Sequence, residues 1–324
     1  MGPIQHRGST TSALAVDVVR AAARAFERDR YLAALLAPAA VRADLIALAA
    51  FAGELARIPA YVSDPIVGEM RLQWWRDTLA AGLAGDRVAS DRVASDRVAG
   101  DGVAGVVGSG EGSGHPIAVA VIAAARRHDI PAAAFQDVIE AQSERLEDQP
   151  FATFEALVAN ARAWDGGLFA IAAGMLVGAL QPLQNGVADD SRMAGDAGAA
   201  YGLARVLLET PVDLTQGRCL LPADVCSRHG ATLGVAFEPG TLAAFDSARR
   251  EVVAAATVRL GNLGERYQRA PRGSRVAALP LALVQPYLSL CRSTDMAGGW
   301  HRDVGPLTRV WRLWLTHRLG RIAN

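Results

Sequence analysis

Two carboxylates four residues apart, Glu209 and Asp213, are the residues in this sequence whose type and spacing best suit chemistry. On one face of a helix, this spacing points both side chains into the same volume. Hard cations such as Mg²⁺ bind oxygen ligands in that arrangement, usually with substrate phosphates completing the shell. Pro211 lies between the two acids and favours the end of the helix there. The pair therefore predicts part of a magnesium and diphosphate site.

The elements that must position this pair are helices. Apolar residues recur at three- and four-residue steps along most of the chain, and no segment shows the alternation of a strand. We therefore predict an all-α fold with a single domain over residues 1–324. The predicted helices cover 13–36, 39–56, 66–82, 116–128, 131–145, 153–180, 192–209, 239–269, 275–292 and 304–320.

Residues 85–114 differ from the rest of the chain. They contain a pentapeptide repeat, Asp-Arg-Val-Ala-Ser, that decays into a Gly/Ser run. The repeat offers too little apolar surface to offset the entropy lost on ordering. We predict that this low-complexity insert forms a solvated loop.

The segment 300–324 is rich in tryptophan and arginine and predicts a basic C-terminal helix. One stripe at helical spacing consists of Leu307, Val310, Trp311, Trp314 and Leu315. One interpretation is a last helix that covers the bundle, with its tryptophans half buried. The alternative is an interfacial helix that lies on a membrane, because tryptophan and arginine suit the headgroup region.

Composition limits the partners and the location. The formal net charge is zero, so no overall field favours nucleic acid. The three cysteines lack metal-ligand spacing, and the N-terminus has no apolar signal segment, which predicts reduced thiols. We expect a cytoplasmic protein that binds no nucleic acid. A peripheral position at the inner membrane is the alternative that the C-terminal helix leaves open.

The residues around the carboxylate pair resemble the second aspartate-rich region of the squalene/phytoene synthase family. The run from Gly217 to Pro222 stands where that family has Gly-Arg-x-Tyr-Leu-Pro, and Glu209 and Asp213 fall on two of its acids. The family's Gln, Asn, Arg and Glu positions hold Gly202, Arg205, Leu208 and Val212. The resemblance implies an isoprenoid-synthase-like helical barrel. Family members use Mg²⁺ to join two prenyl diphosphates head to head.

The family's other acids are replaced by arginine or alanine. Its first pair of aspartates maps onto Ala56 and Arg57, and an acid in the middle of its pattern maps onto Arg145. An arginine cannot ligate Mg²⁺ and places positive charge where a metal would lie. The run from Gly68 to Arg76, with Glu54 to Pro59, resembles a branch related to a mitochondrial assembly factor for respiratory complex I. That branch keeps the fold and lacks the full aspartate motifs.

The arginines at these positions have two interpretations. If the protein is active, Arg57, Arg145, Arg205 and Arg218 bind a diphosphate, and Glu209 and Asp213 hold Mg²⁺. We favour the other interpretation, in which the arginines neutralise acids left in a metal-free core, because an unpaired buried charge is costly. The acids we expect as partners are Glu54, Glu69, Glu140 and Glu209.

The resemblance implies three functions. The favoured one is a catalytically degenerate helper of the complex I assembly type, with no cofactor and with a respiratory-complex subunit as partner. The second is a Mg²⁺-dependent prenyltransferase that uses farnesyl or geranylgeranyl diphosphate in isoprenoid biosynthesis. The third is a carrier that binds a prenyl lipid in the central cavity without turnover. Losing one electrostatic element at the leaving group costs about a hundredfold in rate or more, which favours the first.

Overall fold

The computed structural model describes residues 7–62, 64–84, 114–146, 150–180, 187–232, 239–261, 263–293 and 303–322. The regular elements in these ranges are all helices, which confirms the predicted fold class. In chain order they are α1 (Arg7–Phe26), α2 (Arg28–Leu36), α3 (Ala39–Tyr61), α4 (Pro65–Leu83), α6 (Pro116–Arg127), α7 (Ala132–Ser143), α8 (Phe154–Ala161), η1 (Arg162–Gly166), α9 (Gly167–Leu180), α10 (Val187–Thr215), α11 (Ala223–Arg228), α12 (Pro239–Gly261), α13 (Leu263–Arg269), α14 (Arg272–Ala277), η2 (Leu279–Leu283), α15 (Val284–Ser293) and α16 (Pro306–Leu319). The repeat predicted as a loop lies outside the described residues, except for Gly114.

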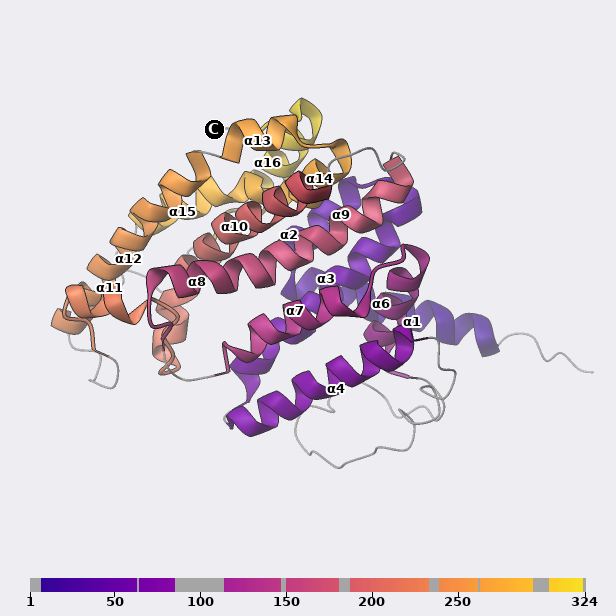
Figure 1. Cartoon of the computed structure of the whole chain (residues 1–324), viewed down its shortest axis with the longest axis horizontal. Helices are drawn as coiled ribbons and strands as arrows, with labels where there is room; N and C mark the ends of the chain where they lie inside the picture. Colours follow the sequence, from indigo (N-terminus) through magenta and orange to yellow (C-terminus); the bar gives the residue numbers. More distant parts are fainter. Residues whose placement is uncertain are drawn as a thin grey trace, which may run out of the picture.

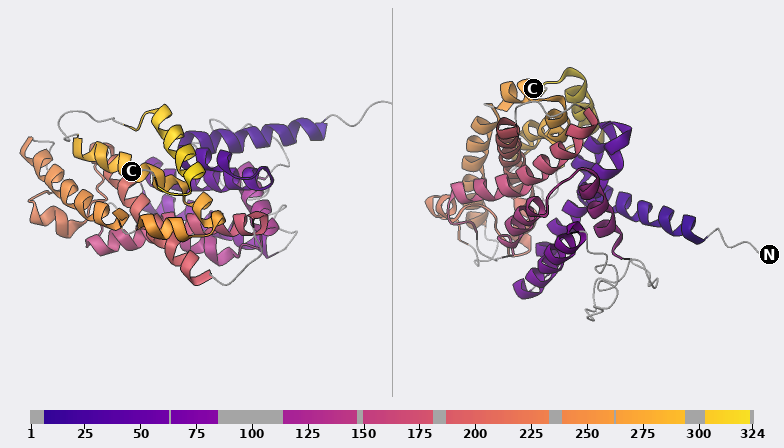
Figure 2. Two further views of the ribbon diagram at one scale, coloured as in Figure 1. Left: turned by 90° about the horizontal axis from the view of Figure 1, so that it is seen from above. Right: turned by 45° about the vertical axis from the view of Figure 1, so that its right-hand side comes forward.

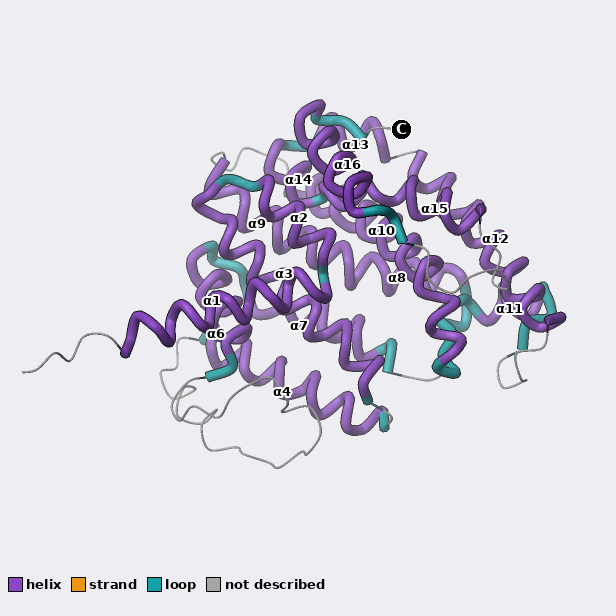
Figure 3. Tube along the Cα trace, turned by 180° about the vertical axis from the view of Figure 1, so that it is seen from behind, coloured by secondary structure: helices purple, strands orange, loops and turns teal. Residues whose placement is uncertain are grey.

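Two long helices, α3 and α10, organise the bundle. α3 packs against α1, α2, α6 and α9, and α10 packs against α8, α9, α12 and α15. α4 and α7 lie side by side along one edge (Figure 1). The first turns of α1 extend away from the bundle (Figure 2), whereas its C-terminal part lies along α3, as the view from behind shows (Figure 3). The buried apolar side chains form one continuous core between these helices.

The start of α4 illustrates how local sequence sets a helix boundary. Asp64 is the N-cap, and its carboxylate accepts a hydrogen bond from the Ile66 nitrogen at 2.9 Å. Pro65 follows at the first helical position, where a missing N–H costs nothing and the fixed φ suits the helix. A cap of this kind stabilises a helix by about 1 kcal/mol. The helix begins one residue before and ends one residue after the predicted range of 66–82.

The largest departure from the predicted elements is in α10. We expected a helix over 192–209 that ends before Pro211, but the helix continues to Thr215 with the proline inside it. Pro211 cannot donate a backbone hydrogen bond, and its neighbour Thr210 donates its hydroxyl to the Val206 carbonyl at 2.6 Å. Pro211 is itself buried, so tertiary packing outweighs its local preference.

Other predicted helices are divided in the structure. The segment 13–36 is two helices, α1 and α2, that meet at Glu27. The helix expected over 153–180 contains a π-helical turn, η1, between α8 and α9. The segment 239–269 contains α12 and α13, and 275–292 ends in the 3-10 turn η2 and α15. The short helix α11 was not predicted. Buried polar residues at Glu27 and in η1 explain two of these breaks, because their side chains pair with other helices.

Glycines bring α10 close to the π-helical turn. A Cβ atom at Gly198 would lie 2.0 Å from the Gly166 nitrogen, and one at Gly202 would lie 2.4 Å from Asp165 Oδ2. Side-chain carbons do not approach other atoms so closely, and therefore only glycine permits this packing. The contact places the Asp165 carboxylate directly beside α10.

The C-terminal helix α16 covers the bundle, where it packs against η2 and α2. Its buried positions are Arg309, Leu313 and Thr316. Leu307 is 86% exposed, whereas Trp311 and Trp314 are 58% and 41% exposed, so the tryptophans are about half buried, as the first interpretation expected. Arg309 takes an inward position that the apolar stripe did not predict. The reason is an ion pair, since Arg309 Nε lies 2.8 Å from Oδ1 of buried Asp29. Among the described helices, none combines the length and apolarity needed to cross a bilayer.

Candidate functional site

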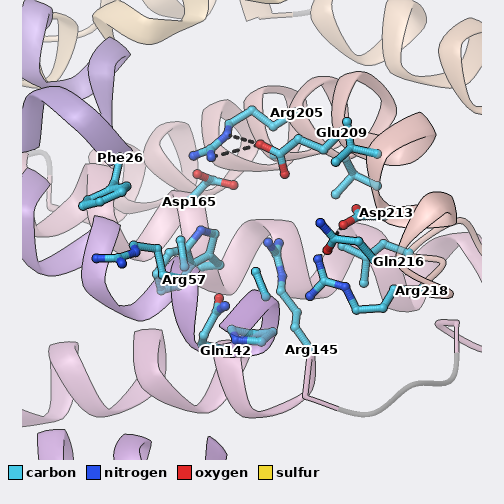
Figure 4. Close-up of a pocket in the computed structure, with 18 of the residues that line it drawn as sticks. Phe26, Arg57, Gln142, Arg145, Asp165, Arg205, Glu209, Asp213, Gln216 and Arg218 are labelled. Atoms are coloured by element: carbon cyan, nitrogen blue, oxygen red, sulfur yellow. Dashed lines mark hydrogen bonds and ion pairs between the residues drawn. The ribbon is translucent and has the colours of Figure 1, made fainter. Parts of the chain in front are cut away.

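A cavity of about 350 Å³ lies between α3, α10, η1 and the C-terminal end of α7 (Figure 4). The six residues predicted from the sequence all line it: Arg57, Arg145, Arg205, Glu209, Asp213 and Arg218. Part of the wall is apolar, including Phe26 and Trp164. The residues named from the sequence therefore share one cavity, and the arrangement of their charges determines what it can bind.

Asp213 lies at the end of the cavity where α10 stops. Its Oδ1 is 2.6 Å from Arg218 Nη2, and its carbonyl accepts a hydrogen bond from the Arg218 nitrogen at 2.9 Å. Gly217 allows the chain to turn back so that Arg218 reaches Asp213, because it adopts a φ of +74° that residues with a side chain rarely adopt. Burial raises the pKa of the Asp213 carboxyl to about 6, although the Arg218 charge opposes that shift.

Glu209 lies one turn earlier on α10 and faces the same cavity, as the spacing predicted. Its Oε1 is 3.1 Å from Arg205 Nη2, and about half of its side chain is exposed. The Arg205 guanidinium also reaches Glu27 Oε1 at 2.6 Å through its other terminal nitrogen. Arg205 thus joins an exposed acid of α10 to a buried acid at the break between α1 and α2.

Glu27 and Asp165 are carboxylates of the site that the sequence argument missed. Arg30 lies between them, 2.8 Å from Glu27 Oε2 and 2.5 Å from Asp165 Oδ1. Burial alone would raise the pKa of Glu27, but the charges of Arg205 and Arg30 outweigh it and lower the pKa. The Arg30 guanidinium also lies 5.1 Å from the Phe169 ring centre. The only sequence signal was a cluster of charged residues, 27–30, within an otherwise apolar helical pattern.

Arg57 occupies the position of a family aspartate at the opposite side of the cavity. Its Nη1 is 3.3 Å from Glu54 Oε1, one turn earlier on α3. Its guanidinium lies 3.9 Å from the centre of the Phe26 ring and 4.8 Å from that of Tyr61. The predicted pairing of Arg57 with Glu54 is therefore present, with aromatic rings contributing to the arginine's surroundings.

Arg145 departs from the expected pairing. Its Nε donates to Asn160 Oδ1 at 2.7 Å, and no ion pair to a carboxylate forms within the described part of the chain. Its Nη2 is buried with no hydrogen-bond partner there. Burial lowers the pKa of this guanidinium, against the opposing charges of nearby acids. Glu69 and Glu140, which we expected as partners of the cavity arginines, lie outside the cavity and pair with Arg76.

The geometry therefore defines a network of arginine–carboxylate pairs. The three acids that line the cavity each contact one arginine: Asp165 with Arg30, Glu209 with Arg205, and Asp213 with Arg218. No group of three or more Asp, Glu, His or Cys side chains suited to a metal ion occurs among the described residues. The three cysteines are buried and unpaired, as expected for reduced thiols.

Comparison with known proteins identifies the family. Residues 23–309 match the squalene/phytoene synthase family. Complex I assembly factor 6 of NADH dehydrogenase (ubiquinone) is 26% identical in Bos taurus and 24% in Homo sapiens, over 206 residues. Those matches cover 63% of this chain and 52% of the relatives, so the chain spans about half of their length.

Solved structures share the architecture at low sequence identity. A dehydrosqualene synthase in complex with ligand has a TM-score of 0.69 at 16% identity, covering 96% of this chain and 98% of that chain. Squalene synthase HpnC from Alicyclobacillus acidocaldarius has a TM-score of 0.60 at 17% identity, covering 88% and 95%. The likeness confirms the isoprenoid-synthase-type helical fold. By the match of its sequence over residues 23–309, the chain belongs to the squalene/phytoene synthase family.

Proposed function

We propose that this protein is a catalytically degenerate family member that acts as a helper in the assembly of respiratory complex I. The relatives named as complex I assembly factor 6 support the biological role. The observation that carries the loss of catalysis is the pairing of Arg218 with Asp213 and of Arg205 with Glu209. In this proposal the cavity is a structural remnant of a synthase site.

The residues present do not fit a magnesium ion. Mg²⁺ requires oxygen ligands at close to octahedral geometry and would need Glu209 and Asp213 as its first carboxylates. Both carboxylates already contact a guanidinium, and Arg57 and Arg145 add two further positive charges to the same cavity. A divalent cation there would be repelled by four arginines. We therefore expect no resident cofactor.

Loss of the metal bears directly on the reaction. Departure of a diphosphate group needs electrostatic stabilisation of the leaving group, which is usually the largest catalytic contribution. Removing one such element lowers the rate by about a hundredfold or more. The guanidinium groups could stabilise the leaving group instead, but Arg57, Arg205 and Arg218 each form an ion pair with a neighbouring acid.

The proposed partner is a subunit or assembly intermediate of the respiratory complex, and no nucleic acid. Such a partner places the protein on the cytoplasmic side of the inner membrane. The outward-facing stripe of α16, with Trp311 and Trp314 exposed, supports a peripheral contact with that membrane. A prenyl lipid held in the cavity without turnover would be compatible with the same location, and the apolar wall formed by Phe26 and Trp164 favours that possibility.

The second candidate function is a Mg²⁺-dependent prenyltransferase acting on farnesyl or geranylgeranyl diphosphate. The observation in its favour is that Glu209 and Asp213 face one cavity together with Arg57, Arg145, Arg205 and Arg218. In this case the arginines would bind the diphosphate, and Glu209 and Asp213 would hold Mg²⁺ in place of their contacts with Arg205 and Arg218.

Two assays separate these functions. Purified protein is incubated with each diphosphate and Mg²⁺, and the extract is analysed for squalene, phytoene and their cyclopropyl intermediates. We expect none above a no-enzyme control, and clear product would favour the prenyltransferase. In parallel, cells lacking the protein are examined for assembled complex I on native gels. We expect less assembled complex, with recovery by the wild type and by Glu209→Gln; normal assembly without the protein would contradict the helper role.

A further inference from the structure

A second cavity, of about 330 Å³, lies between α14 and the C-terminal end of α16 and shares no lining residue with the central cavity. Its charged and titratable lining consists of Arg272, Arg275, His317 and Arg318, with the Tyr267 ring beside them. No carboxylate is among the described residues that line it. This composition is the reverse of the central cavity, where every lining acid meets an arginine.

The polar groups of this second cavity are incompletely satisfied. Arg275 Nη1 donates to the Gly320 carbonyl at 3.2 Å. Neither Arg272 nor Arg318 forms an ion pair with a carboxylate in the described ranges. Thr316 is fully buried, and its hydroxyl has no hydrogen-bond partner there. A buried hydroxyl without a partner is costly, so the end of α16 beside the cavity is not fully satisfied by the described protein groups.

The partial negative charge at the C-terminal end of α16 is too small to balance the three arginines of this cavity. The last carbonyls of a helix carry about half a negative charge in total. Three arginines exceed that charge several-fold. Their excess positive field is visible at His317, whose pKa is lowered by burial and by the charges of Arg272 and Arg318. The cavity therefore carries positive charge that no carboxylate among its described lining residues neutralises.

The outward stripe of α16 leads into this cavity. Leu307, Trp311, Trp314 and Arg318 recur at three- and four-residue steps, so they lie on one helix face. The Trp311 and Trp314 rings stack with centres 5.2 Å apart. The first two turns of this face are apolar and exposed, and the last turn is basic and lines the cavity.

We propose that the cavity between α14 and α16 binds the phosphate of an anionic phospholipid, while the Leu307–Trp314 face enters the interfacial region of the same membrane. Charge complementarity selects the occupant, because phosphate oxygens accept charge-assisted hydrogen bonds from guanidinium groups. The adjoining aromatic face selects a lipid surface over a free anion, since exposed tryptophan favours the headgroup level. The inference deepens the peripheral membrane contact proposed above and does not depend on whether the central cavity is catalytic.

Vesicle binding by the full-length protein tests the charged part of the site. Vesicles of phosphatidylcholine with phosphatidylglycerol should sediment the protein, and vesicles of phosphatidylcholine alone should do so far more weakly. Each arginine near an anionic surface strengthens binding by about fivefold, so Arg272→Gln with Arg318→Gln should weaken it by roughly twenty-fivefold. The matched control is Arg228→Gln with Arg250→Gln, two half-exposed arginines on α11 and α12, which removes the same charge elsewhere. Equal weakening by the control pair would overturn the site.

The apolar part and the source of the phosphate have their own tests. Trp311→Ser with Trp314→Ser should reduce vesicle binding by at least about tenfold, whereas Val119→Ser with Val258→Ser, at other exposed apolar positions, should leave it unchanged. Inorganic phosphate should compete with the vesicles for the protein only at millimolar concentration. Tight binding of inorganic phosphate with no vesicle binding would overturn the lipid assignment, as would vesicle binding indifferent to both double variants. Thermal unfolding of each variant confirms that it is folded, and none of these readouts depends on prenyl products or complex I.

Discussion

The Arg218 guanidinium lies 2.6 Å from the Asp213 carboxylate, at the point where α10 leaves the central cavity. The same two residues are joined a second time through the backbone, from the Arg218 nitrogen to the Asp213 carbonyl. An acid that could have ligated a metal is thereby held against a cation by the turn that follows its helix. The turn from Asp213 to Arg218 therefore fixes this ion pair, and Arg218 neutralises the Asp213 carboxylate without a metal ion.

Removal of Arg205 tests the importance of the buried pairs. Arg205→Gln leaves the Glu27 carboxylate, which is almost fully buried, with Arg30 alone. Breaking a buried pair from one side costs about 3–5 kcal/mol in the free energy of unfolding, measurable by urea denaturation. Arg269→Gln is the control, because Arg269 and its partner Glu265 are largely exposed and their pair contributes less than about 1 kcal/mol. Similar losses in both variants would mean that the Glu27–Arg205 pair is solvated.

The raised pKa of Asp213 predicts a specific dependence on pH. Its carboxyl has a pKa of about 6 in the folded protein, above the model-peptide value, chiefly because it is buried. The folded state therefore holds the proton more tightly, and the resulting stability is present at low pH and is lost as pH rises through 6. Between pH 5 and pH 8, the wild type should lose about 1 kcal/mol of unfolding free energy relative to Asp213→Asn.

Denaturant unfolding of both proteins across that pH range is the measurement. Comparing the two removes the contributions of all other titrating groups, which they share. A difference that stays constant with pH, or one that grows in favour of the wild type at high pH, would show that the Arg218 charge outweighs burial at Asp213.

A side chain at position 202 should destabilise the protein. A Cβ there would lie 2.4 Å from Asp165 Oδ2 and 2.8 Å from the Ala161 Cβ. Gly202→Ala must displace η1 and its ion pair with Arg30, at a cost of about 1–3 kcal/mol in unfolding free energy. Gly261→Ala on α12 is the control, since nothing lies within 4 Å of its added Cβ. That variant should be neutral or slightly stabilising, and the two glycines behaving alike would contradict the packing described for η1.

Much of the fold was predictable because helical periodicity is a local property. The ranges of α4, α6 and α7 follow closely from apolar spacing, whereas α3, predicted over 39–56, continues through Pro59 to Tyr61. The extension of α10 beyond Pro211 was not predictable, because burial of that segment against other helices outweighs the local preference of proline. The inward position of Arg309 on α16 was not predictable for a related reason. Arg309 enters the core to meet Asp29, 280 positions earlier in the chain, and a pair at that separation leaves no local pattern.

The candidate site was predictable in its members and only partly in its pairings. Spacing on α10 placed Glu209 and Asp213 on one face, and the structure has them in one cavity. The pairs of Arg57 with Glu54 and of Arg205 with Glu209 are three or four residues apart and could be anticipated. Glu27 and Asp165 reach the site from other helices, so their roles emerge only from tertiary structure.

The response of folding stability to Mg²⁺ tests the central claim most directly. The melting temperature of the wild type and of Ala56→Asp with Arg57→Asp is measured with and without millimolar Mg²⁺. The double variant should be less stable without metal, because its new carboxylates join existing acids, and Mg²⁺ should recover part of that loss. The wild type should show no such response. Strong stabilisation of the wild type by Mg²⁺, abolished by Asp213→Asn, would mean that Glu209 and Asp213 form a working metal site and would contradict the account.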